Sequence, residues 1–443
     1  MNTKRQKYIV VIIATLLTVV YSTVLNMLNY PKGVNNATAI LALSISIYLL
    51  YAVRHRSDLL IVMLCIFYEN YSVVVGCYLD PSIRPGWMFR QFKDSRVYGI
   101  AILSLLIFEL VLLAAVFLYK EKIDSEKIDI EQFPNNNLIM LGCIVLYLMI
   151  FLTQVDFSEG ERASSNVLNE YKFLFFIIGS LYSKKTNFNR WLWTGIVGIT
   201  SIATFFGGNR VNTLCNIFVL AILWFENYIT LKNVILISIP AIFMMLMIGS
   251  MRYNFTISVN SIQTVWETVK RDKLVADSFT FAYGPTIAAE EMSLNLGIWQ
   301  KAQLLFYNII YIFWGGKYGK YSLPNYTRDY YMHYFGFLGA NYFDMWFGVF
   351  GGVISGVSVV LMLFLKGKGN KESTQVGKVV ALGVLANTLR WYNYNFMQIY
   401  RTGFVIFIVW CASCYVNSML SRKTTKKLKD GNHYEVQKSI PSS

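Results

Sequence analysis

Residues 10–20 read VVIIATLLTVV, an unbroken apolar run in which apolar and polar side chains do not alternate. The run lies within a longer apolar stretch at residues 8–28, and stretches of this kind recur along nearly the whole chain. A bilayer core is about 30 Å thick, so a helix needs about 20 apolar residues to cross it. Membrane-spanning strands would alternate over about 10 residues instead. The sequence therefore predicts an all-α, polytopic integral membrane protein.

The composition of the 443-residue chain agrees with this prediction. Hydrophobic residues make up 55% and charged residues 15%, and the mean hydropathy is +0.44. One soluble core cannot hide that much apolar surface. The net charge of +15 comes from basic residues that lie between the apolar stretches and in one tail, which indicates membrane topology. We expect membrane lipid, and no nucleic acid, as a partner.

About twelve transmembrane helices are predicted from the apolar stretches. They lie at residues 8–28, 37–53, 59–79, 97–119, 137–153, 170–183, 191–206, 211–229, 233–250, 336–365, 378–396 and 402–420. The chain thus divides into a single transmembrane domain (residues 1–420) and a basic tail (residues 421–443). The first stretch is too long for the apolar core of a signal peptide, so we expect it to be retained.

The distribution of Lys and Arg predicts the orientation. If the N-terminus is cytoplasmic and the spans alternate, the cytoplasmic segments carry more than twice as many basic residues as the short outer loops. These include clusters at residues 4–7, 54–56, 120–127, 184–190, 366–378 and 422–429. The basic tail requires an even number of spans, so both termini are expected in the cytoplasm.

One large extracytoplasmic loop is predicted at residues 251–335, between spans nine and ten. A loop of this length without structure of its own is uncommon and usually functional. Within it, residues 298–314 (IWQKAQLLFYNIIYIFW) are apolar and aromatic. A thirteenth span here would put the basic tail outside. We therefore expect an interfacial or re-entrant helix.

Four arginines lie at the predicted outer ends of helices: Arg210, Arg252, Arg390 and Arg401. A guanidinium binds phosphate oxygens bidentately, so such a cluster suits a lipid-linked pyrophosphate. The pair Gly207-Gly208 just before Arg210 allows a tight turn whose N–H groups can meet an anion. The alternative is that each arginine extends to the interface.

The large loop supplies candidate general bases and sugar contacts. His333, the one histidine predicted outside, and Asp329 lie in residues 326–342 (YTRDYYMHYFGFLGANY). Aromatic and polar side chains together suit sugar rings, although an aromatic belt at the start of span ten would show the same pattern.

Carboxylates inside predicted spans are a further functional signal. Glu69 and Glu109 lie in the middle of spans and have no evident cationic partner in the sequence, so they are either protonated structural groups or line a cavity. Asp344 lies nearer the outer surface and is the better candidate. With three histidines and no clustered metal ligands, we expect no metal and no cofactor.

Three segments resemble the Wzy-type O-antigen or oligosaccharide repeat-unit polymerases. They are residues 206–212 (FGGNRVN), residues 251–253 (MRY) and residues 334–352 (YFGFLGANYFDMWFGVFGG). Arg328 and Gly339 also match the Arg-x10-Gly spacing found in some members. The hydropathy profile, with one large outer loop late in the chain, is similar over the whole length.

The resemblance implies an enzyme of the bacterial cytoplasmic membrane. It would be a glycosyltransferase that polymerises undecaprenyl-pyrophosphate-linked oligosaccharide repeat units into surface polysaccharide at the outer face, beside a flippase and a chain-length regulator. For such a reaction we expect Arg210 and Arg252, with Arg390 or Arg401, to hold the pyrophosphate, and His333 or Asp329 to act as the base. Its implied substrate-binding residues are Gly207, Gly208, Arg328, Arg390, Arg401, Asp344 and Tyr342.

Three other functions remain open from the sequence. A glycan ligase would join finished chains to another acceptor. A lipid-linked oligosaccharide flippase has a similar number of spans, but transporters tend to carry internal repeats, and none is evident in this chain. A membrane scaffold without catalysis is the third.

Overall fold

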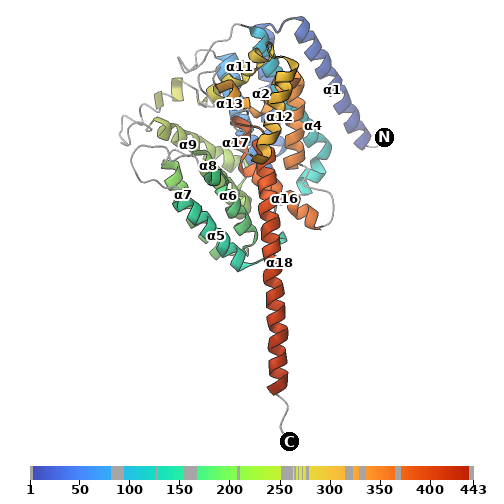
Figure 1. Ribbon diagram of the computed structural model, residues 1–443. Helices are drawn as coiled ribbons and strands as arrows, with labels where there is room; N and C mark the ends of the chain where they lie inside the picture. Colours follow the sequence, from blue (N-terminus) through green and yellow to red (C-terminus); the bar gives the residue numbers. More distant parts are fainter. Residues whose placement is uncertain are drawn as a thin grey trace.

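The computed structural model describes residues 3–80, 94–125, 128–153, 167–206, 210–250, 263, 266–267, 269–271, 273–275, 279–314, 323–328, 336–364 and 371–438. Every regular element in these residues is a helix. The helices form one bundle, from which the C-terminal part of α18 projects (Figure 1). The all-α prediction is therefore confirmed for the described part of the chain.

Helices occupy all twelve segments that the apolar stretches predict. In the first half these are α1 (Thr3–Met27), α2 (Lys32–Ala52), α3 (Ser57–Val73), α4 (Ser95–Ser125), α5 (Asn137–Leu152), α6 (Val167–Leu181), α7 (Asn187–Phe206), α8 (Arg210–Trp224) and α9 (Leu231–Ser250). The second half contains α11 (Gly284–Ser293), α12 (Ile298–Trp314), α13 (Leu323–Arg328), α14 (Asp344–Phe347), α15 (Gly351–Val359), α16 (Lys371–Ala386), α17 (Thr388–Asn393) and α18 (Gln398–Lys438).

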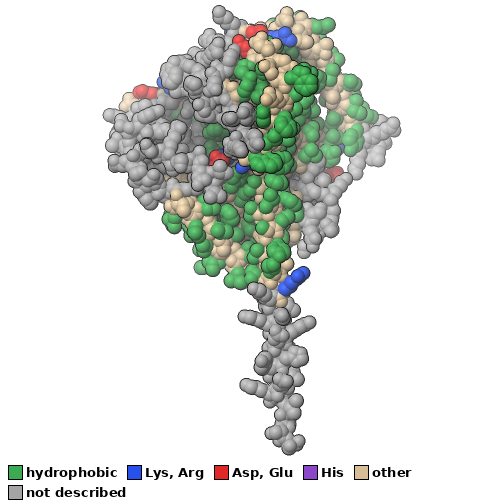
Figure 2. All heavy atoms as spheres, viewed as in Figure 1, with side chains coloured by type: hydrophobic (Ala, Val, Ile, Leu, Met, Phe, Trp, Pro, Cys, Tyr) green, Lys and Arg blue, Asp and Glu red, His purple; other side chains and the backbone are tan. Residues whose placement is uncertain are grey.

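Six helical stretches in the described residues are long and apolar enough to cross a bilayer. They are Gln6–Met27, Lys32–Ala52, Ser57–Leu79, Ser95–Glu121, Gly339–Phe364 and Gln398–Arg422. Apolar helices that are shorter include Asn137–Leu152, Val211–Trp224 and Thr374–Ala386. Hydrophobic side chains cover much of the described surface in Figure 2, as lipid contact requires. The fold is that of a multi-pass helical membrane protein.

The predicted tenth span folds as a series of short helical pieces rather than one helix. After α14, residue Gly348 takes a left-handed conformation (φ 53°) that glycine adopts without strain. The chain continues through α15 into a π-helical segment, Val360–Phe364. The interruption at Gly348 turns the chain, so that Asp344 and α15 both face α4.

Glycines let α15 approach α4 closely. A Cβ atom at Gly352 would collide with the backbone carbonyl of Ser104, and one at Gly356 would lie 2.8 Å from the Cβ of Val111. Small residues of this kind allow helix backbones to meet where no hydrophobic effect drives association. This contact brings Ser104 of α4 next to Asp344.

The predicted eleventh span is also interrupted. Helix α16 ends at Ala386, and the short helix α17 follows after Asn387. The Asn387 amide donates to the hydroxyl of Thr402 on α18 at 2.7 Å, which holds the break in place. Arg390 therefore lies on a separate short helix in the bundle interior.

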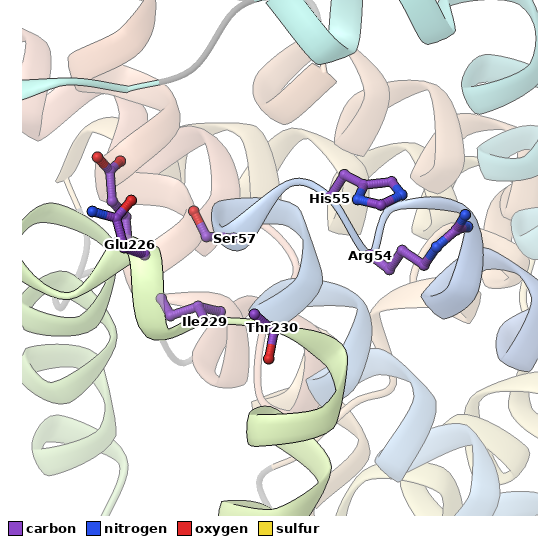
Figure 3. Close-up of a pocket in the computed structure, with 7 residues that line it drawn as sticks. Arg54, His55, Ser57, Glu226, Ile229 and Thr230 are labelled. Atoms are coloured by element: carbon purple, nitrogen blue, oxygen red, sulfur yellow. The ribbon is translucent and has the colours of Figure 1, made fainter.

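Segments that the sequence predicts on the cytoplasmic side meet at one end of the bundle. The Lys185 ammonium pairs with Asp129 at 3.2 Å and with Glu226 at 3.3 Å, and so joins three such loops. A pocket of about 240 Å³ at this end is lined by Arg54 and His55, from the loop between α2 and α3, and by Glu226 (Figure 3).

Segments predicted outside meet each other in the same way. The Asn35 amide at the start of α2 donates to the carbonyl of Ser95 at 3.2 Å. Lys273 of the large loop pairs with Asp80, and its carbonyl accepts from the Tyr71 hydroxyl at 2.8 Å. The loops thus sort into two groups, as the predicted alternation requires, while the orientation in the cell stays a prediction.

Candidate functional site

Arg390 lies in a largely buried ion pair between α17 and α6. One terminal nitrogen is 2.9 Å from Oε1 of Glu170, and the two side chains are 16% and 26% exposed. The other terminal nitrogen donates to Oδ1 of Asn212 on α8 at 2.5 Å. The Nε atom is buried and has no hydrogen-bond partner among the described residues. The buried thiol of Cys215 on α8 also lies within electrostatic range of this guanidinium.

Arg401, on α18, is held by neutral groups. Its Nε donates to the Tyr171 hydroxyl at 2.8 Å, and a terminal nitrogen donates to the Tyr311 carbonyl at 3.0 Å. Both tyrosine rings also lie near the guanidinium, with centroids at 5.7 Å and 5.4 Å. No carboxylate among the described residues pairs with Arg401.

Gln398 completes this arrangement. It accepts from the Tyr171 hydroxyl at 2.8 Å and donates to the Tyr311 hydroxyl at 2.6 Å. Tyr311 lies in the last turn of α12, where the carbonyls have no partner within the helix, so its carbonyl is free to accept from Arg401. We name the whole cluster the arginine site: Glu170, Tyr171, Asn212, Tyr311, Arg390, Gln398 and Arg401.

The arginine site joins segments that are far apart in the sequence. Figure 1 shows α6, α8, α17 and the start of α18 meeting inside the bundle, with α12 against α18. Two of the arginines that the sequence singled out, Arg390 and Arg401, come together here. Because the ion pair and the hydrogen bonds fix both guanidiniums, their positive charge is held in place before any ligand arrives.

Arg210 is the first residue of α8, two residues before Asn212. The N-terminal turn of α8 therefore adjoins Arg390, and the positive end of the helix dipole adds to the positive charge there. The side chain of Arg210 lies outside the described residues, as do Gly207, Gly208, Arg252, Asp329 and His333. Arg328 ends α13, and its side chain is likewise not described.

Asp344 belongs to a second cluster. Asp344 is buried and accepts from Ser104 at 2.6 Å and from the Asn341 amide at 2.7 Å. The buried carboxyl of Glu290 on α11 lies close to it. Burial raises the pKa of Glu290, which Lys301 lowers only in part. We name Ser104, Glu290, Asn341 and Asp344 the carboxyl pair cluster.

The two clusters are linked through α12. The Tyr342 hydroxyl donates to Oδ1 of Asn308 at 2.5 Å, one turn of α12 before Tyr311. Neither Asp344 nor Tyr342 contacts the two arginines in the contacts found among the described residues. Their predicted role in substrate binding stays a prediction.

Glu109, in the middle of α4, is fully buried in a polar network between helices. Its Oε1 accepts from Ser46 at 2.7 Å and from the Asn70 amide, while Oε2 has no hydrogen-bond partner among the described residues. The Tyr392 hydroxyl donates to Asn70 at 2.6 Å. Glu69 is also buried.

Sequence reasoning missed the residues that hold the two arginines. Glu170 and Tyr171 lie at the start of the predicted span at residues 170–183, and Gln398 lies between two predicted spans without any motif. Their common signal was a polar group at the outer end of a predicted span, which many other residues share. Comparisons with models of protein families, with curated proteins and with solved structures found no match.

Proposed function

We propose that the protein is a membrane glycosyltransferase that polymerises lipid-linked oligosaccharide repeat units at the outer face of a bacterial cytoplasmic membrane. A hydroxyl oxygen of the acceptor unit attacks the anomeric carbon of the donor glycan. The bond from that carbon to undecaprenyl pyrophosphate breaks, and the lipid pyrophosphate leaves with the electron pair. The hydroxyl proton passes to a general base. The reaction needs no cofactor in this form.

The arginine site is the observation that carries this proposal. Its described residues include two guanidiniums and one carboxylate, and this carboxylate pairs with Arg390, inside a bundle of apolar helices. Positive charge without a full set of counter-ions is unfavourable in such a place unless an anion binds there. A leaving pyrophosphate is an anion of suitable chemistry, and fixed guanidiniums stabilise its developing charge.

Roles for the remaining residues follow from this placement. Arg390 and Arg401 bind the pyrophosphate, and Arg210 joins them from the first turn of α8. We propose Arg252 as a further cation, and His333 or Asp329 as the base in the large outer loop. The twelve spans, the cytoplasmic termini and the outer position of residues 251–335 belong to the same proposal.

Deletion of the protein in its host tests the proposal. The surface and lipid-linked glycans are then separated on a gel. Loss of the polymer ladder, with single repeat units still displayed outside, is the expected result. Repeat units that accumulate on the cytoplasmic side would show that the protein is a flippase and that the arginine assignments are wrong.

A flippase is the second candidate, and one observation favours it. Glu109 places a carboxyl in the middle of a long apolar helix, within a network from four helices. Polar sites near the middle of the membrane are typical of transporters. The deletion experiment separates the two functions directly.

A further inference from the structure

Two helices of the arginine site, α12 and α18, stay in contact beyond it through exposed aromatic rings. Arg401 of α18 donates to the carbonyl of Tyr311 on α12 at 3.0 Å. Two residues after Tyr311 and three after Arg401, Phe313 packs edge-to-face against Phe404, with ring centroids 5.2 Å apart. Phe313 and Phe404 are 52% and 38% exposed. The contact between the two helices therefore runs from a guanidinium directly to an apolar surface.

Further exposed apolar side chains extend this surface along both helices, within about one turn of Phe313 and Phe404. Figure 2, in the same view as Figure 1, shows hydrophobic side chains over α12 and the start of α18. We name this surface the aromatic seam: Ile309, Phe313, Trp314, Phe404, Phe407 and Ile408.

Helix α12 is fixed on the bundle by contacts along its length. In its first turn, the carbonyl of Lys301 accepts from the indole N–H of Trp346 at 2.7 Å. One turn before Tyr311, Oδ1 of Asn308 accepts from the backbone N–H of Leu323 at 3.1 Å. Because both ends of α12 are held, the aromatic seam keeps its shape before any ligand arrives, which lowers the entropy cost of binding.

The aromatic seam differs from an ordinary lipid-facing surface because it begins at a cation. Arg401 is held by neutral groups, and both Arg401 and Tyr311 keep part of their surface exposed. A positive charge beside a row of apolar side chains fits a molecule with an anionic end and an apolar chain. Rigid aromatic rings offer flat faces against which the flat alkene units of an isoprenoid chain can pack.

We infer that the aromatic seam binds the isoprenoid chain of the lipid diphosphate whose diphosphate group lies at Arg390 and Arg401. This inference rests on the proposed function, because it takes the same lipid as its ligand. The chain leaves the arginine site along α12 and α18 and passes from there into the bilayer. Residues 298–314, which the sequence predicts to be an interfacial or re-entrant helix, thereby take part in substrate binding.

Two ligands that share a diphosphate group and differ in their chain test the inference. The protein is placed in phosphatidylcholine nanodiscs, where no anionic lipid competes, and its affinities for farnesyl diphosphate and inorganic pyrophosphate are measured. The variant is Phe313→Ala with Phe404→Ala, and the matched control is Phe188→Ala, an exposed phenylalanine on α7. Partition of farnesyl diphosphate into the bilayer is the same for every variant, so differences between variants report on the seam.

The double variant is expected to lose at least about tenfold in affinity for farnesyl diphosphate, because two apolar contact surfaces are removed. It should bind inorganic pyrophosphate like the wild type, since that ligand has no chain. The control should bind both ligands like the wild type.

The other outcomes overturn the inference in distinguishable ways. Weaker binding of both ligands by the double variant would show that the rings support the arginine site itself. Equal binding of farnesyl diphosphate by the wild type and the double variant would remove the seam from the binding site, while the proposed function stands. If the wild type binds neither ligand, the proposed function fails and the inference fails with it.

Photolabelling of the unaltered protein decides the question if the double variant does not fold. A farnesyl diphosphate analogue with a diazirine at the end of its chain is irradiated in the same nanodiscs, and the labelled residues are identified by mass spectrometry. Labelling of the aromatic seam that excess farnesyl diphosphate removes would support the inference. Labelling of other helices only, or even labelling that the competitor leaves unchanged, would overturn it.

Discussion

The guanidinium of Arg401 donates to the hydroxyl of Tyr171 at 2.8 Å, and no carboxylate among the described residues pairs with it. An arginine held by a neutral hydroxyl and a carbonyl keeps its full charge for a ligand. Arg390 differs, because Glu170 neutralises part of its charge. The two arginines are therefore expected to contribute unequally to binding an anion, with Arg401 the stronger contributor.

Tyr171→Phe tests how firmly Arg401 must be held. The change removes the hydroxyl that accepts from Arg401 and donates to Gln398, while the ring remains near the guanidinium. We expect polymer synthesis to fall about tenfold, since a hydrogen bond to a charged group is worth roughly 1.5–3 kcal/mol. This fall is measured as the rate of polymer formation in isolated membranes, at matched protein levels.

The control for this variant is Tyr228→Phe. Tyr228 is 64% exposed and lies near the end of α8. It lies beyond the end of α8 at Trp224, which is about 18 Å from Asn212 along the helix at about 1.5 Å per residue. A loss of activity equal to that of Tyr171→Phe would show that the effect is general, and the assigned role of Tyr171 would be dropped.

Gly352→Ala tests the contact between α15 and α4. A methyl group at this position would collide with the Ser104 backbone, which cannot move without shifting α4. Overpacking in a close-packed interior costs typically about 1–3 kcal/mol, and more where backbone is struck. We expect a clear drop in the unfolding temperature in detergent. Gly142→Ala is the matched control, because nothing lies within 4 Å of a Cβ there, and it should unfold like the wild type.

The contact between Arg401 and Tyr171 and the contact between α15 and α4 show what the sequence could and could not predict. The apolar stretches predict where the helices lie, because an apolar environment leaves the backbone few alternatives to helix. The breaks at Gly348 and Asn387 were not predicted, since hydropathy is insensitive to a turn inside an apolar run. The pairing of Arg390 with Glu170 depends on how distant helices pack, and local patterns carry no such information.

Glu290 predicts a pH-dependent stability. Burial raises the pKa of Glu290 to about 8. Between the ordinary pKa of a glutamate and pH 8, Glu290 therefore stays protonated in the folded protein but is ionised in the unfolded chain. Stability is then fully present at low pH and falls as the pH rises toward 8, by up to about 1.4 kcal/mol for each pH unit. Unfolding temperatures between pH 5 and pH 9 measure the slope.

Glu290→Gln is expected to flatten this slope and to stabilise the protein at pH 8–9, because it keeps a hydrogen-bonding group beside Asp344 without a charge. The exposed Glu131→Gln is the control and should leave the slope unchanged. A slope that persists in Glu290→Gln would show that another group titrates, and the assignment to Glu290 would be wrong.

Cysteine labelling checks the predicted orientation. Asn227 is exposed at the predicted cytoplasmic end, and Leu294 is 54% exposed in the predicted outer loop. In a background without the six native cysteines, Leu294→Cys should react with a membrane-impermeant maleimide in intact cells. Asn227→Cys should react only after the membrane is opened. The reverse pattern would invert the topology and place the large loop inside.

Reconstitution of the arginine variants tests the central claim most directly. Lipid-linked repeat units from the deletion strain are incubated with purified wild-type protein, Arg401→Gln, or Arg422→Gln, an exposed arginine on the same helix α18. The account predicts a polymer ladder with the wild type and Arg422→Gln, and a loss of at least about 100-fold with Arg401→Gln, as for other preorganised charge-stabilising groups. A full ladder from Arg401→Gln, or none from the folded wild type, would contradict it.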